Sequence, residues 1–370
     1  MTRHVFRTIV FVVLATLAAP GWAGFQVADL VFVPIVSSET GANESVWRSD
    51  VTFFNAGDVD IDIAVVFLPT GVSSNSVRFR DRSTWLGGRE SDGFGIVDTT
   101  LADIPPNGTV VIEDIVGTHW PEDATAYGNG ALVVFAYEAD TLEDDGSRVA
   151  SNVVVNSRTF NQTTILQQDP NNDDRFVEVD TTYGQTIPGV PWYNLAYSED
   201  FSDDEDLSSQ LLLGGVENDD FRYNVGILNA SDPQTQVSLR LQPFQADGSP
   251  FLDGDGNEIS SIVSMPPLAH LQYFRVMSTV LGLDPDVDDL DGVTIRVSWI
   301  GWQTSGVDPV PAITSYGSIV DNVSNDPTTV LPSFGEPYPV DCVWGTEPVD
   351  GIGVKAAPSR AGRPFEIPSR

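Results

Sequence analysis

The sequence of 370 residues contains one cysteine, Cys342, and one lysine, Lys355. A single cysteine excludes an intramolecular disulfide, so the folded state depends on its hydrophobic cores. Of the three histidines, His119 and His270 fall in different halves of the chain, so neither half offers the histidine pair that zinc sites favour. The sequence also lacks a Gly-x-Ser-x-Gly motif and a glycine-rich phosphate loop, which gives no support to a serine hydrolase or a nucleotide-binding enzyme.

Basic residues are scarce throughout. The chain has 18 Lys and Arg against 53 Asp and Glu, a formal net charge of −35. Such a field repels nucleic acid and anionic membranes and attracts cations. We therefore expect no nucleic-acid partner.

Long apolar runs are absent except at the N-terminus. Arg3 and Arg7 precede an apolar stretch from Ile9 to Ala19, and Gly21-Trp22-Ala23 forms a small-residue cleavage site. This order predicts a signal peptide over residues 1–23, with an uncleaved anchor as the alternative. Removal leaves 16 basic and 53 acidic residues, a charge of −37. We expect a secreted protein, extracellular, periplasmic or at the cell surface, without membrane insertion after cleavage.

The strongest pattern is an internal repeat. Residues 46–69 align without a gap on residues 220–243 at an offset of 174. Identical pairs are Arg48/Arg222, Val51/Val225, Asn55/Asn229, Ala56/Ala230, Asp58/Asp232 and Pro69/Pro243. Each segment reads as a strand, an Asn-Ala turn and an alternating strand. The repeated Arg48 and Arg222 either bind a ligand or bridge a carboxylate or backbone carbonyls, and we favour the structural interpretation.

Further blocks repeat in the same order. Residues 104–106 match 265–267, residues 129–134 match 291–296, and Ser157 and Asn161 match Ser318 and Asn322. The offset falls to about 161 because the loops differ in length. The order of the blocks predicts the duplication of a whole domain.

Short strands separated by turn signals predict an all-β protein of two tandem Ig-like β-sandwiches, with a jelly roll or a partly open barrel as alternatives. The predicted boundaries are a signal peptide at 1–23, sandwich one at 24–168, a linker at 169–182, sandwich two at 183–335 and an extended tail at 336–370.

Two motifs carry a resemblance. They are Trp47-Arg48-Ser49-Asp50-Val51 with its counterpart Phe221-Arg222-Tyr223-Asn224-Val225, and Ser157-Arg158-Thr159-Phe160 followed by Tyr183-Gly184-Gln185-Thr186-Ile187-Pro188. With them, most of residues 30–330 resembles a group of bacterial secreted proteins with tandem β-rich domains. The resemblance implies a fold and a compartment, and no activity.

Calcium is the best-supported cofactor hypothesis. Asp253, Asp255 and Asn257 alternate with Gly254 and Gly256, Glu258 follows directly, and the four side chains offer the oxygen ligands that Ca²⁺ prefers. The loop departs from the EF-hand pattern at Glu258, which stands where that pattern has glycine. The alternative is a plain hairpin turn, since Asp-Gly and Gly-Asn are hairpin signals.

Exposed aromatic side chains would support sugar binding. Trp302 follows Gly301 and would be available if it lay on a loop, and Trp192 with Tyr193 is a further candidate. The alternative is that these rings belong to the core. Two facing carboxylates would be needed for a glycosidase, but 53 acidic residues supply many chance pairs.

Three functions stay open. The first is an exported, non-enzymatic structural, adhesive or surface-associated protein, whose partner would be a cell-surface or extracellular protein or glycan. The second is a calcium- or carbohydrate-binding module. The third is a carboxylate-dependent hydrolase.

Overall fold

The computed structural model describes residues 26–41, 45–73, 85–86, 101–141, 149–169, 172–198, 209–231, 234–305 and 311–334. Strands predominate in these ranges and the helices are short, so the predicted all-β fold is confirmed. The predicted signal peptide (1–23), the predicted tail (336–370) and Cys342 lie outside the described residues. None of the described helices has both the length and the apolar composition that crossing a bilayer requires.

The first half of the chain forms two antiparallel sheets that share a strand. Its elements are β1 (Leu30–Thr40), β2 (Val46–Asn55), β3 (Ile61–Pro69), β4 (Trp85–Leu86), β5 (Thr109–Ile112), α3 (Ile115–His119), α4 (Pro121–Tyr127), β6 (Asn129–Glu138), β7 (Val153–Asp169), β8 (Asn172–Pro188) and β9 (Val190–Pro191). One sheet contains β4-β3-β6-β1 with β9 on β1, and the other contains β2-β7-β8 with β5 on β2. Strand β1 pairs first with β6 and then, from Ser38, with β2, so it passes from one sheet to the other.

The inner faces of these sheets form one apolar core. Ile61, Ile63, Val65 and Phe67 alternate along β3 and point into it, and Phe53 of β2 faces them from the other sheet. The short helix α3 adds its buried first turn to the same core. The first half is therefore a β-sandwich.

The second half forms a second pair of antiparallel sheets. Its elements are the 3₁₀ helix η5 (Trp192–Asn194), β10 (Ala196–Tyr197), β11 (Ser209–Val216), β12 (Phe221–Asn229), β13 (Thr235–Phe244), β14 (Ser261–Met265), β15 (His270–Tyr273), α5 (Val276–Thr279), β16 (Asp291–Thr304), β17 (Ala312–Asp321), β18 (Pro327–Val330) and β19 (Ser333–Phe334). One sheet has the order β10-β17-β12-β15 with β18 on β17, and the other β14-β13-β16-β11-β19. A core that includes Val225, Ile227, Leu239 and Ile295 fills the space between them.

The same order of strand pairings recurs in the two halves. The pairs β2–β5, β2–β7 and β7–β8 correspond to β12–β15, β12–β17 and β17–β18. In the other sheet, β3–β4, β3–β6, β1–β6 and β1–β9 correspond to β13–β14, β13–β16, β11–β16 and β11–β19. Phe53 and Ile227 both point into the core of their own sandwich. Common descent of the halves stays a prediction.

The repeated asparagines hold the turns that the sequence predicts. The Asn55 Nδ2 donates to the carbonyls of Val59 (2.7 Å) and Ile104 (2.8 Å), and its Oδ1 accepts from the Gly57 N–H (2.8 Å). Asn229 makes the matching bonds, to the carbonyls of Thr235 and Pro266 at 2.8 Å each and from the Ser231 N–H at 3.1 Å. Each buried amide thereby joins its own turn to a distant segment.

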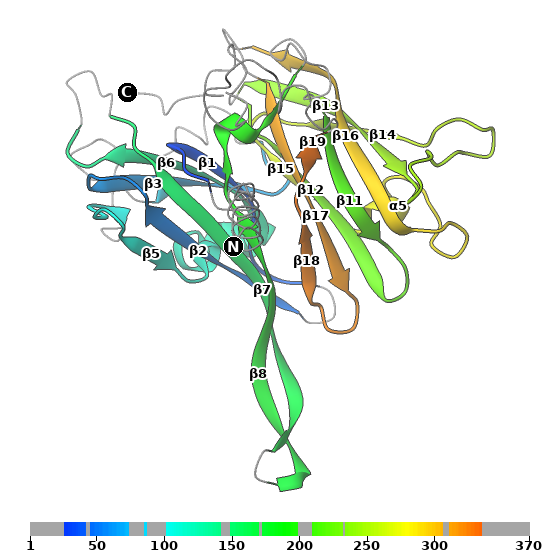
Figure 1. The fold of residues 1–370 in the computed structure, drawn as a ribbon, viewed down its shortest axis with the longest axis horizontal. Coiled ribbons are helices and arrows are strands. Elements are labelled where there is room, and N and C mark those ends of the chain that lie inside the picture. The colour runs from blue at the N-terminus through cyan, green and yellow to red at the C-terminus, as the bar shows by residue number, and fades with distance from the viewer. Residues whose placement is uncertain are drawn as a thin grey trace, which may run out of the picture.

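The two sandwiches lie side by side (Figure 1) and share a buried apolar interface. The outer face of the β3-β6-β1 sheet packs against the second half. The first half contributes Leu30, Phe32, Ala64, Val66, Leu68, Ala131, Val133 and Phe135, and the second Leu195, Tyr197, Leu228, Ala230, Leu268 and Ala312. Strand β3 is therefore buried on both faces, and the halves are joined by packing as well as by the chain.

The predicted linker at 169–182 is wrong. Residues 172–182 belong to β8, which pairs with β7 from Asn156–Pro188 to Asp169–Asn172. The chain then adds β9 to β1, so the first sandwich extends to Pro191 instead of ending at residue 168.

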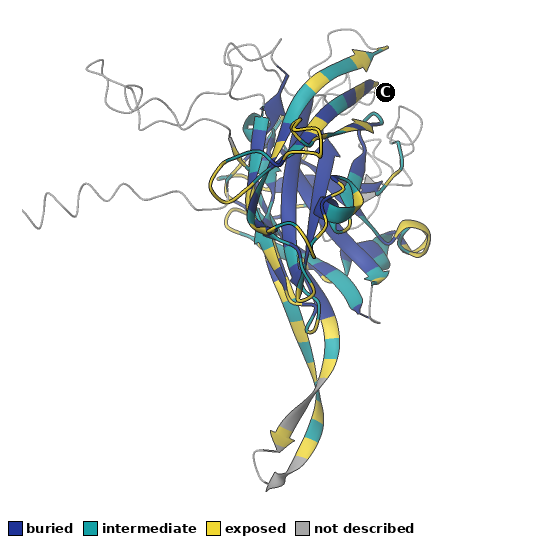
Figure 2. Cartoon of the chain, turned by 90° about the vertical axis from the view of Figure 1, so that its right-hand side faces the viewer, coloured by how far each residue is buried: buried dark blue, intermediate teal, exposed yellow. Residues whose placement is uncertain are grey.

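The far part of β7 and β8 projects from the body as a two-stranded ribbon, which we call the arm (Figures 1 and 2). It begins beyond the pair Gln162–Thr182. Exposed and half-buried residues alternate there, and Phe176 is 63% exposed. The arm has no core of its own, because a two-stranded ribbon cannot bury a face.

Candidate functional site

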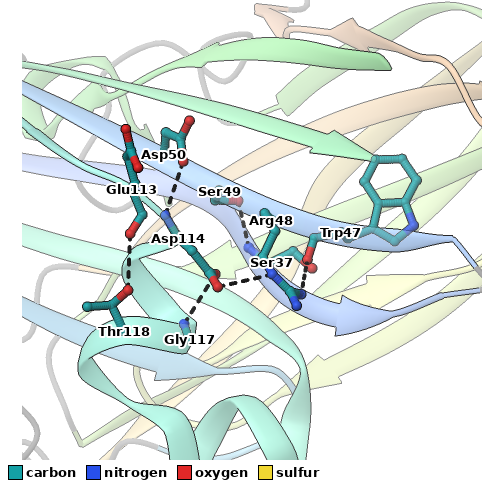
Figure 3. A network of polar contacts seen from close by, with 9 residues as sticks. All are labelled: Ser37, Trp47, Arg48, Ser49, Asp50, Glu113, Asp114, Gly117 and Thr118. Atoms are coloured by element: carbon teal, nitrogen blue, oxygen red, sulfur yellow. Dashed lines mark hydrogen bonds and ion pairs between the residues drawn. The ribbon is translucent and has the colours of Figure 1, made fainter. Parts of the chain in front are cut away.

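Arg48 of β2 has a structural role in the first sandwich (Figure 3). Its Nε lies 3.0 Å from the Asp114 Oδ2 in an ion pair, and its Nη1 donates to the Trp47 carbonyl (2.8 Å). Asp114 adopts a left-handed conformation (φ 41°) just before α3. Its N–H donates to the Asp50 Oδ1 (3.0 Å), and its own carboxylate accepts from the Gly117 N–H (3.3 Å). Arg48 and Asp50 together fix the start of α3.

The equivalent positions of the second sandwich keep this backbone but change the charge. Asn224 stands at the position of Asp50, and Arg275 at that of Asp114. The Arg275 N–H donates to the Asn224 Oδ1 (3.1 Å), and Arg275 is again left-handed (φ 50°) before α5. The carboxylate that pairs with Arg48 is thus replaced by a second guanidinium.

Arg222, the counterpart of Arg48, is buried without an ion pair among the described residues. It is 4% exposed; its Nη1 donates to the Asn322 Oδ1 (3.0 Å) and its Nη2 to the Asn325 Oδ1 (2.9 Å). Its Nε is buried and has no hydrogen-bond partner within the described part of the chain. Burial lowers the pKa of Arg222, Arg275 lowers it further, and nearby Asp321 opposes them. An arginine nevertheless stays charged.

Arg222 lines a pocket of about 230 Å³ between the two sandwiches. The first sandwich contributes Ser37, Glu39, Trp47, Asn129 and Gln185, among others. The second contributes Arg222, Gln272, Phe274, Tyr316 and Ser318, among others. Most of these side chains carry hydrogen-bonding groups and three are aromatic, so the pocket suits a small polar ligand.

One part of the pocket wall is closed by Tyr316. Its ring packs with Ile35 and Ile187 in a small apolar cluster. The ring also covers Gly226, where a Cβ would lie 2.0 Å from a ring carbon, so no larger residue fits at that position. Tyr316 thus joins β17 to strands of the first sandwich.

A chain of hydrogen bonds among residues of the pocket lining runs across the boundary between the sandwiches to His270. The Glu39 Oε1 accepts from the Asn129 Nδ2 (2.8 Å), and the Thr70 hydroxyl donates to the Asn129 Oδ1. Thr70 also meets the His270 Nδ1 (2.6 Å), and the His270 Nε2 lies 3.3 Å from the Tyr316 hydroxyl. Because Thr70 donates to Asn129, His270 carries its proton on Nδ1, and its Nε2 accepts from Tyr316.

Burial sets the charge states along this chain. It lowers the pKa of His270 to about 3, so the imidazole is neutral near pH 7. It raises the pKa of Glu39, against the hydrogen bonds from Asn129 and Ser37 that lower it. Within the described residues, Glu39 is the only carboxylate that lines the pocket.

The predicted calcium loop is a tight turn in which the Asp253 carboxylate accepts hydrogen bonds from the backbone of the turn itself. The Asp253 Oδ1 accepts from the N–H groups of Asp255 and Asn257, both at 2.9 Å, and these bonds lower the pKa of Asp253. The Glu258 Oε2 accepts from Gln242 (2.6 Å), outside the turn. In the described part of the chain, no three His, Cys, Asp or Glu side chains are grouped to hold a metal ion. Calcium at this turn stays a hypothesis.

The predicted sugar-binding aromatics are partly buried. Trp302 lies in β16 opposite Val237, not on a loop, and packs with Trp299 against the second core. The Trp192 Nε1 donates to the Asp29 Oδ1 (3.1 Å), and the Tyr193 hydroxyl donates to the Val27 carbonyl (2.7 Å). The structure brings none of Trp302, Trp192 and Tyr193 to the pocket between the sandwiches.

No protein-family model, curated protein or solved structure matches the chain.

Sequence reasoning found Arg222 but missed its surroundings. Glu39, Gln272 and Tyr316 stand in strands and carry no motif, so only the packing of the two halves reveals them. One signal was available: the repeat continues at offset 161 through α3 and α5 and places Arg275 opposite Asp114. That reversal of charge marks Arg222 as an arginine without the partner that Arg48 has.

Proposed function

We propose that this protein is an exported, non-enzymatic binding module whose site is the pocket between the two sandwiches, and that its ligand is a carbohydrate. The observation that carries the proposal is the pocket itself. Amide, hydroxyl and aromatic side chains from both sandwiches meet in one cavity. Sugar hydroxyls need such donors and acceptors, and aromatic rings pack on the apolar faces of sugars.

The size and charge of the pocket support this proposal. At about 230 Å³ it is smaller than the roughly 300–1,000 Å³ of drug-sized sites, which fits a single ring. Glu39 is the only described carboxylate in the lining, whereas hydrolysis by two carboxylates requires a facing pair. The proposal that the protein is exported rests on the N-terminal pattern. The proposed family is the group of bacterial secreted proteins that the repeat resembles.

Gln272 provides the test. It lines the pocket from β15 and is half-buried. Gln272→Ala should weaken the binding of a responsive sugar by about three- to tenfold, the equivalent of one lost hydrogen bond. Isothermal titration against a panel of neutral and acidic monosaccharides measures it. The matched control is Gln236→Ala, an exposed strand glutamine outside the pocket lining, which should leave the affinity unchanged. If no sugar in the panel binds, the proposal is wrong.

The arm favours a second function, that of a structural or adhesive surface protein. It presents two strands beyond the body with open edges, and such edges can pair with another chain. Loss of attachment or assembly after removal of the arm, with the body still folded, would support this function over the first.

A further inference from the structure

We propose that the ligand is an amino sugar, and that its ammonium group pairs with the carboxylate of Glu39. This inference rests on the proposed function and names the chemical class of its ligand. It starts from the charges in the pocket wall. The described lining contains one carboxylate, that of Glu39, and one guanidinium, that of Arg222. The two differ in what they can offer a ligand.

The carboxylate of Glu39 is available from the pocket. Glu39 is half-buried; its Oε1 accepts from the Asn129 Nδ2 (2.8 Å) and lies 3.5 Å from the Ser37 hydroxyl oxygen. Because Ser37 and Asn129 both line the pocket, this oxygen lies at its wall. The Oε2 accepts no hydrogen bond from a described residue and, unlike the Nε of Arg222, is not closed off from solvent. Glu39 therefore keeps room for a donor from a ligand.

Arg222 offers a ligand little. It is 4% exposed, and its terminal nitrogens donate to Asn322 and Asn325. Nearby Asp321 partly offsets the charge of its guanidinium. The chain as a whole carries a formal charge of −35, and such a field attracts cations. The accessible charge in the lining is therefore negative, and the ligand that it selects is a cation.

Strand pairing places an aromatic ring next to this carboxylate. Glu39 of β1 and Trp47 of β2 are direct cross-strand partners, so their side chains leave the sheet on the same face, and both line the pocket. A cation bound by Glu39 would thus lie beside the Trp47 ring, where cation–π attraction adds to the ion pair. Burial, and then the charge of Glu39, raise the pKa of Tyr316 well above its usual value. The field of Glu39 thus reaches the wall that the second sandwich contributes.

The uncharged part of the pocket indicates an amino sugar rather than a metal ion. Calcium takes about six to eight oxygen ligands, whereas the described lining has a single carboxylate. A primary ammonium needs only a few acceptors, and the amides and hydroxyls of Gln185, Gln272 and Ser318 would meet sugar hydroxyls. An amino sugar combines one cationic group with several hydroxyls, as this lining requires.

The test compares D-glucosamine with D-glucose on the full-length protein by isothermal titration at pH 7 and physiological salt, where the field of the body is screened beyond about 8 Å. The two sugars differ only at the second carbon, which carries an ammonium in one and a hydroxyl in the other. Glucosamine should bind about ten- to a hundredfold more tightly, as expected for a charge-assisted hydrogen bond. Equal affinities would overturn the inference and leave sugar binding standing. Binding of neither would overturn both.

Glu39→Gln removes the charge and keeps an oxygen that can accept from Asn129. It should reduce the preference for glucosamine over glucose to less than about threefold. The matched control is Glu138→Gln, which removes the same charge at the other end of β6, outside the pocket lining, and it should keep the preference. Loss of preference in both variants would mean that the field of the whole body attracts the amine, and would overturn the inference. If Glu39→Gln does not fold, the two sugars on the unaltered protein still decide.

A glucosamine hexamer separates the two sources of this chemistry. Tighter binding than that of the monosaccharide indicates a glycan, and equal binding indicates a free amino sugar. In either case Glu39→Gln should weaken the binding of the hexamer and Glu138→Gln should not. Unchanged binding of the hexamer to Glu39→Gln would overturn the inference.

Discussion

Asn55 and Asn229 are the residues on which both halves depend most directly. Each is fully buried and satisfies two distant carbonyls and one N–H of its own turn. Alanine at either position leaves buried carbonyls without a donor. We expect each substitution to lower the free energy of unfolding by about 2–4 kcal/mol.

Urea unfolding of the two variants measures this loss. The control is Asn152→Ala, an exposed residue, which should change stability by less than about 0.5 kcal/mol. Losses below 1 kcal/mol in both variants would show that the turns hold without these amides.

His270 should make stability depend on pH. Its pKa is about 3 in the folded protein because of burial, against about 6.5 when unfolded. Between these values the unfolded state binds more protons, so stability falls as the pH falls, by up to about 1.4 kcal/mol per unit. The groups that face it are Tyr316 and, through Thr70 and Asn129, Glu39.

His270→Gln removes the side chain that takes up this proton in the unfolded state. From pH 7 to pH 4.5, the original protein should lose about 2–3 kcal/mol relative to the variant. Chemical denaturation at several pH values gives the difference, in which the carboxylates that both proteins share cancel. Parallel pH curves for the original protein and His270→Gln would contradict the prediction.

At the scale of single residues, identity between the two repeated segments predicted structural roles better than the chemical type of a residue did. It singled out Asn55 and Arg48, which the structure shows at fixed structural positions. The acidic turn at Asp253 drew attention for its composition, but the backbone of the turn uses that carboxylate. Composition alone does not tell whether an oxygen faces a cation or its own loop.

The arm is an element that the body does not need for folding. Replacing Ile165–Val179 by Asn-Gly closes the ribbon after the pair Thr164–Asp180 with a two-residue turn. Since the arm has no core, we expect the free energy of unfolding of the body to change by less than about 1 kcal/mol. Thermal and urea unfolding check this. A loss of several kcal/mol would mean that the arm is held by contacts with the body.

Elements with one buried face were predictable, and those without one were not. Strand β13 alternates Val237, Leu239 and Leu241 toward the core, and the sequence shows that alternation. In β8, Glu178, Asp180 and Thr182 are exposed and the residues between them only half-buried. The outer part of β8 alternates, with Val177 and Val179 next to the acidic Glu178 and Asp180, but neither of its faces is buried, and its acidic, Asn-rich start reads as a linker.

The molecule as a whole should unfold in one transition, because its two sandwiches share the apolar interface. Leu228→Asp places a charge in that interface, where it has no partner, at a cost of several kcal/mol. We expect calorimetry to show one endotherm for the original protein and two for the variant. Val111→Asp, at an exposed position, should keep the single endotherm. Two endotherms in the original protein would show that the halves unfold independently.

A signal for this interface was present in the sequence. Ile61–Pro69 reads IDIAVVFLP, nearly continuous in apolar residues rather than strictly alternating, as expected of a strand covered on both faces. Which surface covers the second face is a tertiary question, and repeat periodicity alone treats the two halves as separate units.

The covered outer face of the first sandwich also limits how the chain can be divided. Cutting after Pro191 would leave a fragment with Phe32, Val66, Leu68 and Phe135 on an open sheet. An apolar sheet face exposed to water promotes self-association. Half-length fragments made for crystallography or display would need polar replacements on this apolar sheet face. In the intact chain the second sandwich covers it.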